Sequence, residues 1–194
     1  MAELLIAMAL SGIILGTIAG TSIIQRKSYD IQEQITEMVQ TARAAMDMMT
    51  REIRMAGYDP TDSAGAGITS ALPNSITFTL DITDDNGKGP PDEDTDDKNE
   101  NITYSLYTAD GIQKLGRKSK ATANNQPVAE HVQSLEFQYW NESDDPTFTA
   151  EDVRLIRVEI TIRTSKPDPN YSPNGGYRTY TLTSLITPRN LALE

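Results

Sequence analysis

The chain opens with a long apolar segment that gives way, after about 24 residues, to a regularly amphipathic one. Leu4–Ile24 holds 21 residues without a charged side chain, and as a helix it would measure about 30 Å, the thickness of a bilayer hydrocarbon core. Gln25–Ala56 contains neither proline nor glycine, and its apolar residues recur in steps of three and four. Gly57 and Pro60 then end the pattern. We therefore predict one continuous helix over Leu4–Ala56.

The remaining residues alternate between apolar and polar with a period of two, which predicts β-strands. The predicted strands are Ser75–Asp81, Asn101–Tyr107, Ser134–Trp140, Val153–Arg163 and Tyr177–Thr187, with a short sixth around Ile112–Leu115. Alternation gives each strand one dry face, so we expect the helix to cover the dry side of an antiparallel sheet. The predicted fold class is α+β.

Two polar insertions interrupt the strands. Asp84–Glu100 is too acidic to pack by itself, so we predict a mobile loop, and Lys166–Gly176 is rich in proline and glycine and predicts no regular structure. The acidic insertion offers oxygen ligands suited to calcium, although their order does not match an EF-hand. A solvated loop is the favoured interpretation, and whether residues 84–100 bind calcium stays open.

Composition argues against most kinds of chemistry. The net charge of -11 and the absence of a basic stripe make nucleic acid an unexpected partner. The chain has no cysteine, and its one histidine, His131, has no partner at a metal-binding or triad spacing, so we interpret it as structural. We expect no catalytic residue, no metal, no cofactor and no small-molecule substrate.

Two features distinguish the apolar segment from a plain membrane anchor. Glu3 stands against the apolar run, and a carboxylate that enters lipid needs a partner. Gly12, Gly16 and Gly20 recur every fourth residue, so they share a helix face on which another helix can approach closely. Glu3 at headgroup depth and a chance glycine spacing are the simpler interpretations.

The charges around the segment give conflicting signals on orientation. Arg26 and Lys27 follow the span, which would place the rest of the chain in the cytoplasm. The β-rich remainder is typical of an exported domain. The conflict disappears if a basic leader preceded Met1, and we expect such a leader.

The segment Glu3–Gly12 resembles the start of mature type IV pilins and pseudopilins, and Met49–Pro60 is similar to the helix end of PilW-type minor pilins. Weaker similarities to the same group are found at Ile102–Leu106, Leu115–Arg117, Val132–Tyr139 and Arg189–Asn190. The resemblance departs from the family in its start, because only Met1 and Ala2 precede Glu3, and the first half of the helix has no proline. The lack of a cysteine pair favours a minor subunit.

The resemblance implies a pilin-like fold with three parts: a membrane or filament-core segment (1–24), an amphipathic continuation (25–57) and a periplasmic head (58–194). It implies a minor pilin that helps to initiate a type IV pilus, with other pilins and inner-membrane lipid as partners and a location in the inner membrane and the pilus. Glu3 would neutralise the N-terminal amine of a neighbouring subunit, and Gly12, Gly16 and Gly20 would pack helices.

Two alternatives remain open at this stage. A minor pseudopilin of a type II secretion system, similar to the GspJ class, would have the same helix and sheet. A calcium-dependent adhesin head on a membrane anchor would use the acidic insertion. An enzyme is disfavoured.

Overall fold

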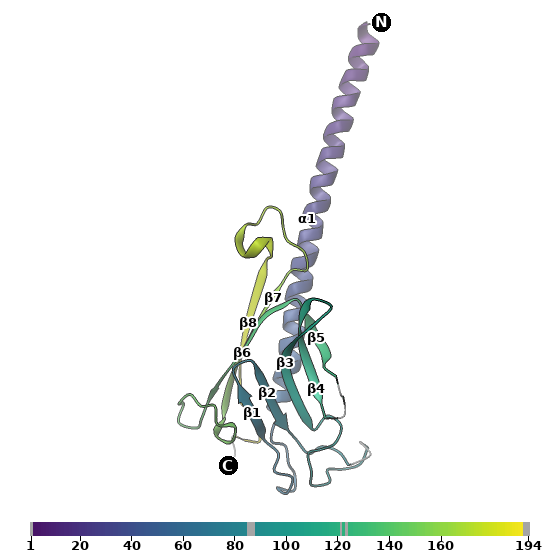
Figure 1. The fold of residues 1–194 in the computed structure, drawn as a ribbon. Helices are drawn as coiled ribbons and strands as arrows, with labels where there is room; N and C mark the ends of the chain where they lie inside the picture. Colours follow the sequence, from purple (N-terminus) through teal and green to yellow (C-terminus); the bar gives the residue numbers. More distant parts are fainter. Residues whose placement is uncertain (1, 85–87, 121, 123, 192–194) are drawn as a thin grey trace.

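A computed structural model describes residues 2–84, 88–120, 122 and 124–191. A single long helix, α1 (Ala2–Arg54), projects from a β-rich head, and its N-terminus lies far from the strands (Figure 1). The 53 residues of α1 make a rod about 80 Å long. The predicted continuous helix is confirmed, although it begins and ends two residues earlier than the pattern indicated.

The strands form two antiparallel sheets, where the pattern predicted one. The strands are β1 (Ile68–Leu72), β2 (Ser75–Thr79), β3 (Asn101–Ala109), β4 (Ile112–Ser119), β5 (Gln126–Glu130), β6 (Val132–Trp140), β7 (Leu155–Arg163) and β8 (Thr179–Ile186). The first sheet has the order β1-β2-β3-β4-β5 and the second the order β6-β7-β8. His131, with φ of 57°, turns the chain between β5 and β6, so β6 pairs with β7 and not with β5. All six predicted strands exist with shifted ends; β1 and β5 were not predicted.

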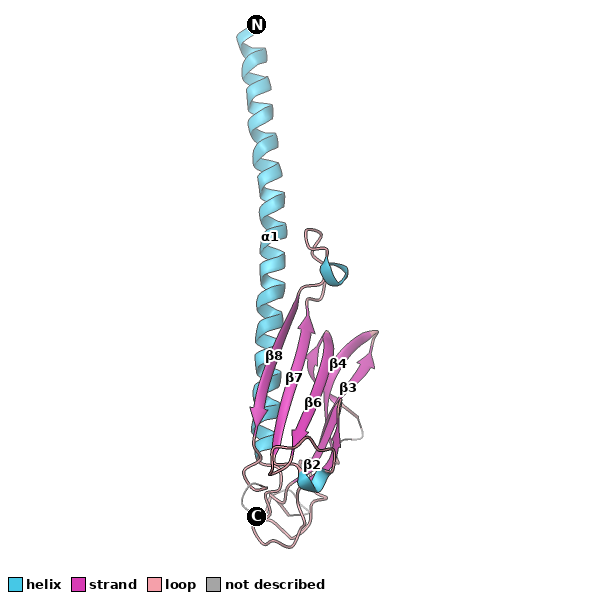
Figure 2. Ribbon diagram, turned by 90° about the vertical axis from the view of Figure 1, so that its left-hand side faces the viewer, coloured by secondary structure: helices cyan, strands magenta, loops and turns pink. Residues whose placement is uncertain are grey.

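The C-terminal half of α1 lies along β7 and β8, while its N-terminal half extends beyond the head (Figure 2). The helix buries one stripe of side chains, from Met38 through Met49 to Ile53. This stripe packs into one core with the alternate residues of β7, among them Ile156 and Ile160. The period of three and four in the sequence is therefore the packing face of the helix. The head covers this face partly at Ile35 and buries it from Met38 onward.

The C-terminal segment returns to the end of α1 and caps it. The backbone N–H of Arg189 donates to the carbonyl of Arg54 at 3.1 Å. The side-chain amide of Asn190 donates to the carbonyls of Met55 and Ala56 at 3.2 and 3.4 Å. The last carbonyls of a helix have no partner within it, so these contacts fix where the rod ends against the head.

The acidic insertion is anchored at its C-terminal end, which corrects the prediction that it is too acidic to pack. Glu100 is fully buried. Its carboxylate accepts hydrogen bonds from the backbone N–H groups of Ile82, Thr83 and Asp97, at 2.9, 2.8 and 3.2 Å. Backbone donors thus provide the compensation that burial of a charge requires. Residues 85–87 of the predicted loop lie outside the described residues.

The second insertion contains a short 3₁₀ helix, η2 (Pro173–Gly176), where the sequence predicted no regular structure. A similar turn, η1 (Ala150–Asp152), precedes β7. Asn174 and Gly175 adopt left-handed backbone conformations within η2, which is how a proline- and glycine-rich segment closes into a compact turn.

Candidate subunit-assembly interface

The first part of α1 presents large apolar side chains that nothing else in the described chain covers. Leu4, Leu5, Ile6, Met8, Leu10, Ile13, Ile14, Leu15, Ile18, Ile23 and Ile24 are between 56% and 70% exposed. Among the described residues, α1 is the one helix long and apolar enough to cross a membrane. Burying apolar surface is favourable by about 25 cal/mol for each Å² removed from water, so a continuous exposed segment of this kind is typical of an interaction surface.

Three hydroxyl groups within this segment are satisfied by its own backbone. The Ser11 hydroxyl donates to the carbonyl of Ala7 at 2.8 Å. Thr17 donates to the carbonyl of Ile14 at 2.8 Å, and Thr21 to that of Thr17 at 2.9 Å. A hydroxyl without a partner is costly in an apolar environment, and these bonds remove that cost. They were not considered in the sequence analysis, although the spacing of hydroxyl residues along an apolar helix was a usable signal.

Gly12, Gly16 and Gly20 lie on one face of the projecting part of α1, as predicted from their spacing. A Cβ atom added to any of the three would meet no atom within 4 Å. The flat strip that they form therefore faces no other part of the described chain. The structure places the three residues together but shows no partner for them, so their role in subunit packing stays a prediction.

Glu3 lies in the first turn of α1 and is exposed. A carboxylate at this position interacts favourably with the partial positive charge at the helix N-terminus. No described residue forms an ion pair with it. Its predicted pairing with the amine of a neighbouring subunit is therefore not tested within one chain.

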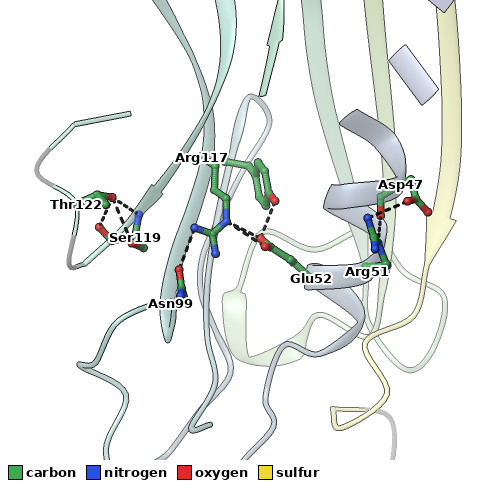
Figure 3. Close-up of polar contacts among 8 residues, drawn as sticks. Asp47, Arg51, Glu52, Asn99, Arg117, Ser119 and Thr122 are labelled. Carbon is green, nitrogen blue, oxygen red and sulfur yellow. Dashed lines mark hydrogen bonds and ion pairs between the residues drawn. The ribbon is translucent and has the colours of Figure 1, made fainter. Parts of the chain in front are cut away.

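A buried polar cluster fixes the other end of the rod to the head. Arg117 on β4 donates from Nε to both carboxylate oxygens of Glu52 on α1, and the hydroxyl of Tyr104 on β3 donates to Glu52 at 2.6 Å. Arg117 also donates from Nη1 to Asn99 in the acidic insertion, as Figure 3 shows. Burial, together with the neighbouring Glu52 carboxylate, raises the pKa of Tyr104 far above its ordinary value.

This cluster was missed in the sequence, although one signal pointed to it. Leu115 and Arg117 are two residues apart on a strand and therefore face the same side. The strand predicted from the sequence ended at Leu115, whereas the strand in the structure continues to Ser119 and buries Arg117 as well as Leu115. A buried guanidinium needs a carboxylate partner. The sequence did not reveal that the partner is Glu52, 65 residues earlier in the chain.

Asp81 is a second buried acid near the base of the head. It is fully buried, and its Oδ2 accepts a hydrogen bond from the backbone N–H of Glu93 at 3.2 Å. Its Oδ1 has no hydrogen-bond partner. Burial raises the pKa of Asp81, and the negative charges of Glu100 and Asp59 act in the same direction. Ionisation of Asp81 therefore opposes folding.

The residues considered for metal or catalytic chemistry do not converge. Among the described residues, no three histidine, aspartate or glutamate side chains are grouped so that they could hold a metal ion. His131 lies in the turn between β5 and β6, and its Nδ1 is buried without a hydrogen-bond partner. The distinctive features of the described part of the chain are therefore the exposed apolar part of α1 and the polar cluster that joins α1 to the head through Glu52 and Arg117.

Comparison with known proteins gives a likeness at the level of solved structures. No protein-family model matches the chain, and no curated protein matches it. Among solved structures, the chain is similar to a type IV-like pilin from Thermus thermophilus, with 10% sequence identity and a TM-score of 0.49. The likeness covers 79% of this chain and 98% of that one.

Proposed function

We propose that this chain is a pilin-type filament subunit, and specifically a minor pilin that helps to initiate a type IV pilus. The observation that carries the proposal is the long, exposed apolar part of α1, which continues into a helix that packs against a folded head. Soluble monomeric proteins rarely expose a continuous apolar surface of this extent. Lipid covers it before assembly, and the helices of neighbouring subunits cover it in the filament.

The chemistry of the rod supports helix packing as well as membrane insertion. Gly12, Gly16 and Gly20 leave a strip on which a second backbone can approach closely. The hydroxyls of Ser11 and Thr17 are already bonded to the rod's own backbone, so neither lipid nor a neighbouring helix has to satisfy them. The rod can therefore move from one apolar environment to the other without breaking a hydrogen bond.

Glu3 supplies the specific contact in this proposal. In a bundle of such helices, its carboxylate pairs with the N-terminal amine of a neighbouring subunit. A buried charge is tolerated only when it is paired, so the pair favours the one axial register in which each Glu3 meets an amine. Glu3 thus sets the position of one subunit against the next.

The resemblance of Glu3–Gly12 and Met49–Pro60 to pilin segments supports the minor-pilin assignment, since the second segment is similar to PilW-type proteins. A minor pseudopilin of a type II secretion system is the alternative, because it needs the same rod and head. On the minor-pilin proposal the head lies in the periplasm, and the subunit passes from the inner membrane into the pilus.

Deletion of the gene in its host bacterium tests the proposal and separates the two candidates. Surface pili are counted by electron microscopy, and secreted enzymes are assayed in the same culture. Loss of pili with normal secretion, restored by the full chain, is the result expected for a minor pilin. Normal pili with impaired secretion would identify the pseudopilin, and no change in either would contradict both.

A further inference from the structure

The insertion between β7 and β8 rises beside α1 toward its apolar part (Figures 1 and 2). It is fixed in place by α1, because the Gln34 side-chain carbonyl accepts hydrogen bonds from the Lys166 backbone N–H at 2.9 Å and from the Ser165 hydroxyl at 3.2 Å. The backbone N–H of Asp168 donates to the carbonyl of Gly176 at 2.7 Å and closes the insertion. The insertion is thus a preorganised part of the head.

A groove of about 620 Å³ separates this insertion from α1. On the helix side it is lined by Ile24 and Lys27, and on the other side by Asp168, Asn170 and Arg178. Ile24 is the last residue of the uncharged run. Lys27 lies three residues further along, about 4.5 Å by helical rise, which is within the headgroup layer if Ile24 marks the edge of the hydrocarbon.

The charges within the groove leave a positive excess. Arg178 donates from Nε and Nη2 to the Asp168 carboxylate at 2.9 and 2.8 Å, and its guanidinium lies 4.7 Å from the Tyr171 ring centroid. Asp168 is buried and is neutralised by this pair. Lys27 forms no ion pair with any described residue. The groove therefore presents one uncompensated ammonium group and the outer edge of a guanidinium.

The surroundings of the groove differ in charge from the rest of the protein. Residues 25–34 and 163–178 carry five basic residues against three acidic ones, whereas the whole chain has a net charge of -11. The basic residues are Arg26, Lys27, Arg163, Lys166 and Arg178, and the acidic residues are Asp30, Glu33 and Asp168. Tyr29 on α1 is 69% exposed at the same level, and tyrosine and basic residues together are typical of the membrane interface.

We propose that this groove binds the headgroup of an inner-membrane phospholipid, with the phosphate between Lys27 and Arg178 and the start of an acyl chain against Ile24. The proposal rests on the proposed function, since it requires α1 to be anchored in a bilayer before assembly. Bound lipid holds the head at a fixed height and rotation over the membrane. The subunit gives up this lipid when its rod moves into the filament.

The test uses the full chain in detergent micelles with phosphatidylglycerol added, and native mass spectrometry counts the lipid that stays on the protein. Lys27→Gln removes the uncompensated charge from the groove. Arg26→Gln is the matched control, because it removes the same charge from a neighbouring residue that is not among those lining the groove. We expect Lys27→Gln to reduce retained phosphatidylglycerol about fivefold and Arg26→Gln to reduce it by less than about twofold.

Three results would overturn the proposal. An equal loss from both variants would show that the attraction is general, and no loss from either would show that the groove holds no headgroup. Retention of diacylglycerol, which has no phosphate, at the level of phosphatidylglycerol would show that only acyl chains bind.

Resistance of the wild-type chain to alkaline extraction from membranes is scored separately. If the chain is extracted, the membrane anchor of the proposed function is wrong. If the chain resists extraction but Lys27→Gln does not reduce the retained phosphatidylglycerol, only the proposed lipid site is wrong.

Discussion

Arg117 on β4 donates from Nε to both carboxylate oxygens of Glu52 on α1, at distances of 3.0 and 2.9 Å. The Arg117 side chain is only 8% exposed and that of Glu52 24%. The pair joins the rod to the sheet at a point where the Arg117 guanidinium is almost excluded from water and the Glu52 carboxylate is partly excluded from it. On the proposed function such a joint is needed, because the rod would be held by neighbouring subunits while the head meets solvent.

Glu52→Gln tests how much this joint contributes. Removing one charge leaves Arg117 buried and unpaired, so we expect a loss of about 3 kcal/mol in the free energy of unfolding. Asp47→Asn is the control, because Asp47 pairs with Arg51 on the same helix at 3.0 Å (Figure 3). The side chains of this second pair are 67% and 72% exposed. The control should lose less than about 1 kcal/mol. Chemical unfolding of the full chain in detergent, followed by Trp140 fluorescence, measures both. Equal losses would mean that the buried pair is not a special joint.

The end of the rod gives a second prediction. Gly57 has φ of 77°, and a Cβ atom there would clash with the Leu191 side chain. Gly65 has φ of 62° with open space around it. Gly65→Ala therefore loses only the backbone preference, about 1 kcal/mol, and we expect Gly57→Ala to lose clearly more. Leu191→Ala in the Gly57→Ala background should recover part of the difference, and no recovery would contradict the proposed packing of the C-terminal segment.

Asp81 makes stability depend on pH. Because burial raises the pKa of Asp81 above its ordinary value of 3.8, the stability it contributes is fully present below pH 3.8 and is lost as the pH rises through the folded-state pKa. Asp81→Asn should therefore raise the unfolding temperature at pH 7 and change it little near pH 3.5. Asp62→Asn, at an exposed position, should change it at neither pH. Thermal unfolding of the full chain at both pH values measures this. A lower unfolding temperature for Asp81→Asn at pH 7 would show that the ionised form is needed.

Removal of residues 1–24 tests the division between rod and head. The core formed by α1 and the strands begins at Met38, so the shortened chain keeps every buried residue of the helix. We expect it to be soluble and monomeric without detergent, as measured by light scattering coupled to size-exclusion chromatography. Continued dependence on detergent would show that another surface of the head also requires cover.

The sequence predicted the long helix well, because a charge-free run followed by a stripe in steps of three and four leaves few other structures. It predicted strands with strong alternation and missed β1 and β5, which are five residues each. Pro127 within β5 argued against a strand, and Ile68–Leu72 has only one large apolar residue at its buried positions. Alternation shows which face of a strand is buried, but it does not show which other strand pairs with it. The separation of the strands into two sheets could therefore not be deduced from the sequence.

The residues of the candidate site also fall into two groups, those that the sequence pointed to and those that only the structure revealed. The four-residue spacing pointed to the glycine face, and the position of Glu3 against the apolar run, together with the family resemblance, pointed to Glu3. The structure places all four residues on the exposed part of the rod, and their role in assembly stays a prediction. The Glu52–Arg117 pair and the groove at Lys27 depend on residues far apart in the sequence. Spacing cannot find such contacts, because they exist only after the strands have packed against the helix.

The pairing of helices through the glycine face is the most direct test of the account. Gly16→Leu fills the flat strip, and Ala7→Leu adds the same side chain on the opposite face of α1, because nine residues of helix turn through 900°. Leucine has a higher helix propensity than glycine, so loss of function in Gly16→Leu cannot come from a weakened helix. In a host that lacks the native gene, we expect Ala7→Leu to restore surface pili and Gly16→Leu to restore few or none at the same protein level. Normal pili with Gly16→Leu would contradict the claim that this exposed rod packs against its neighbours through that face.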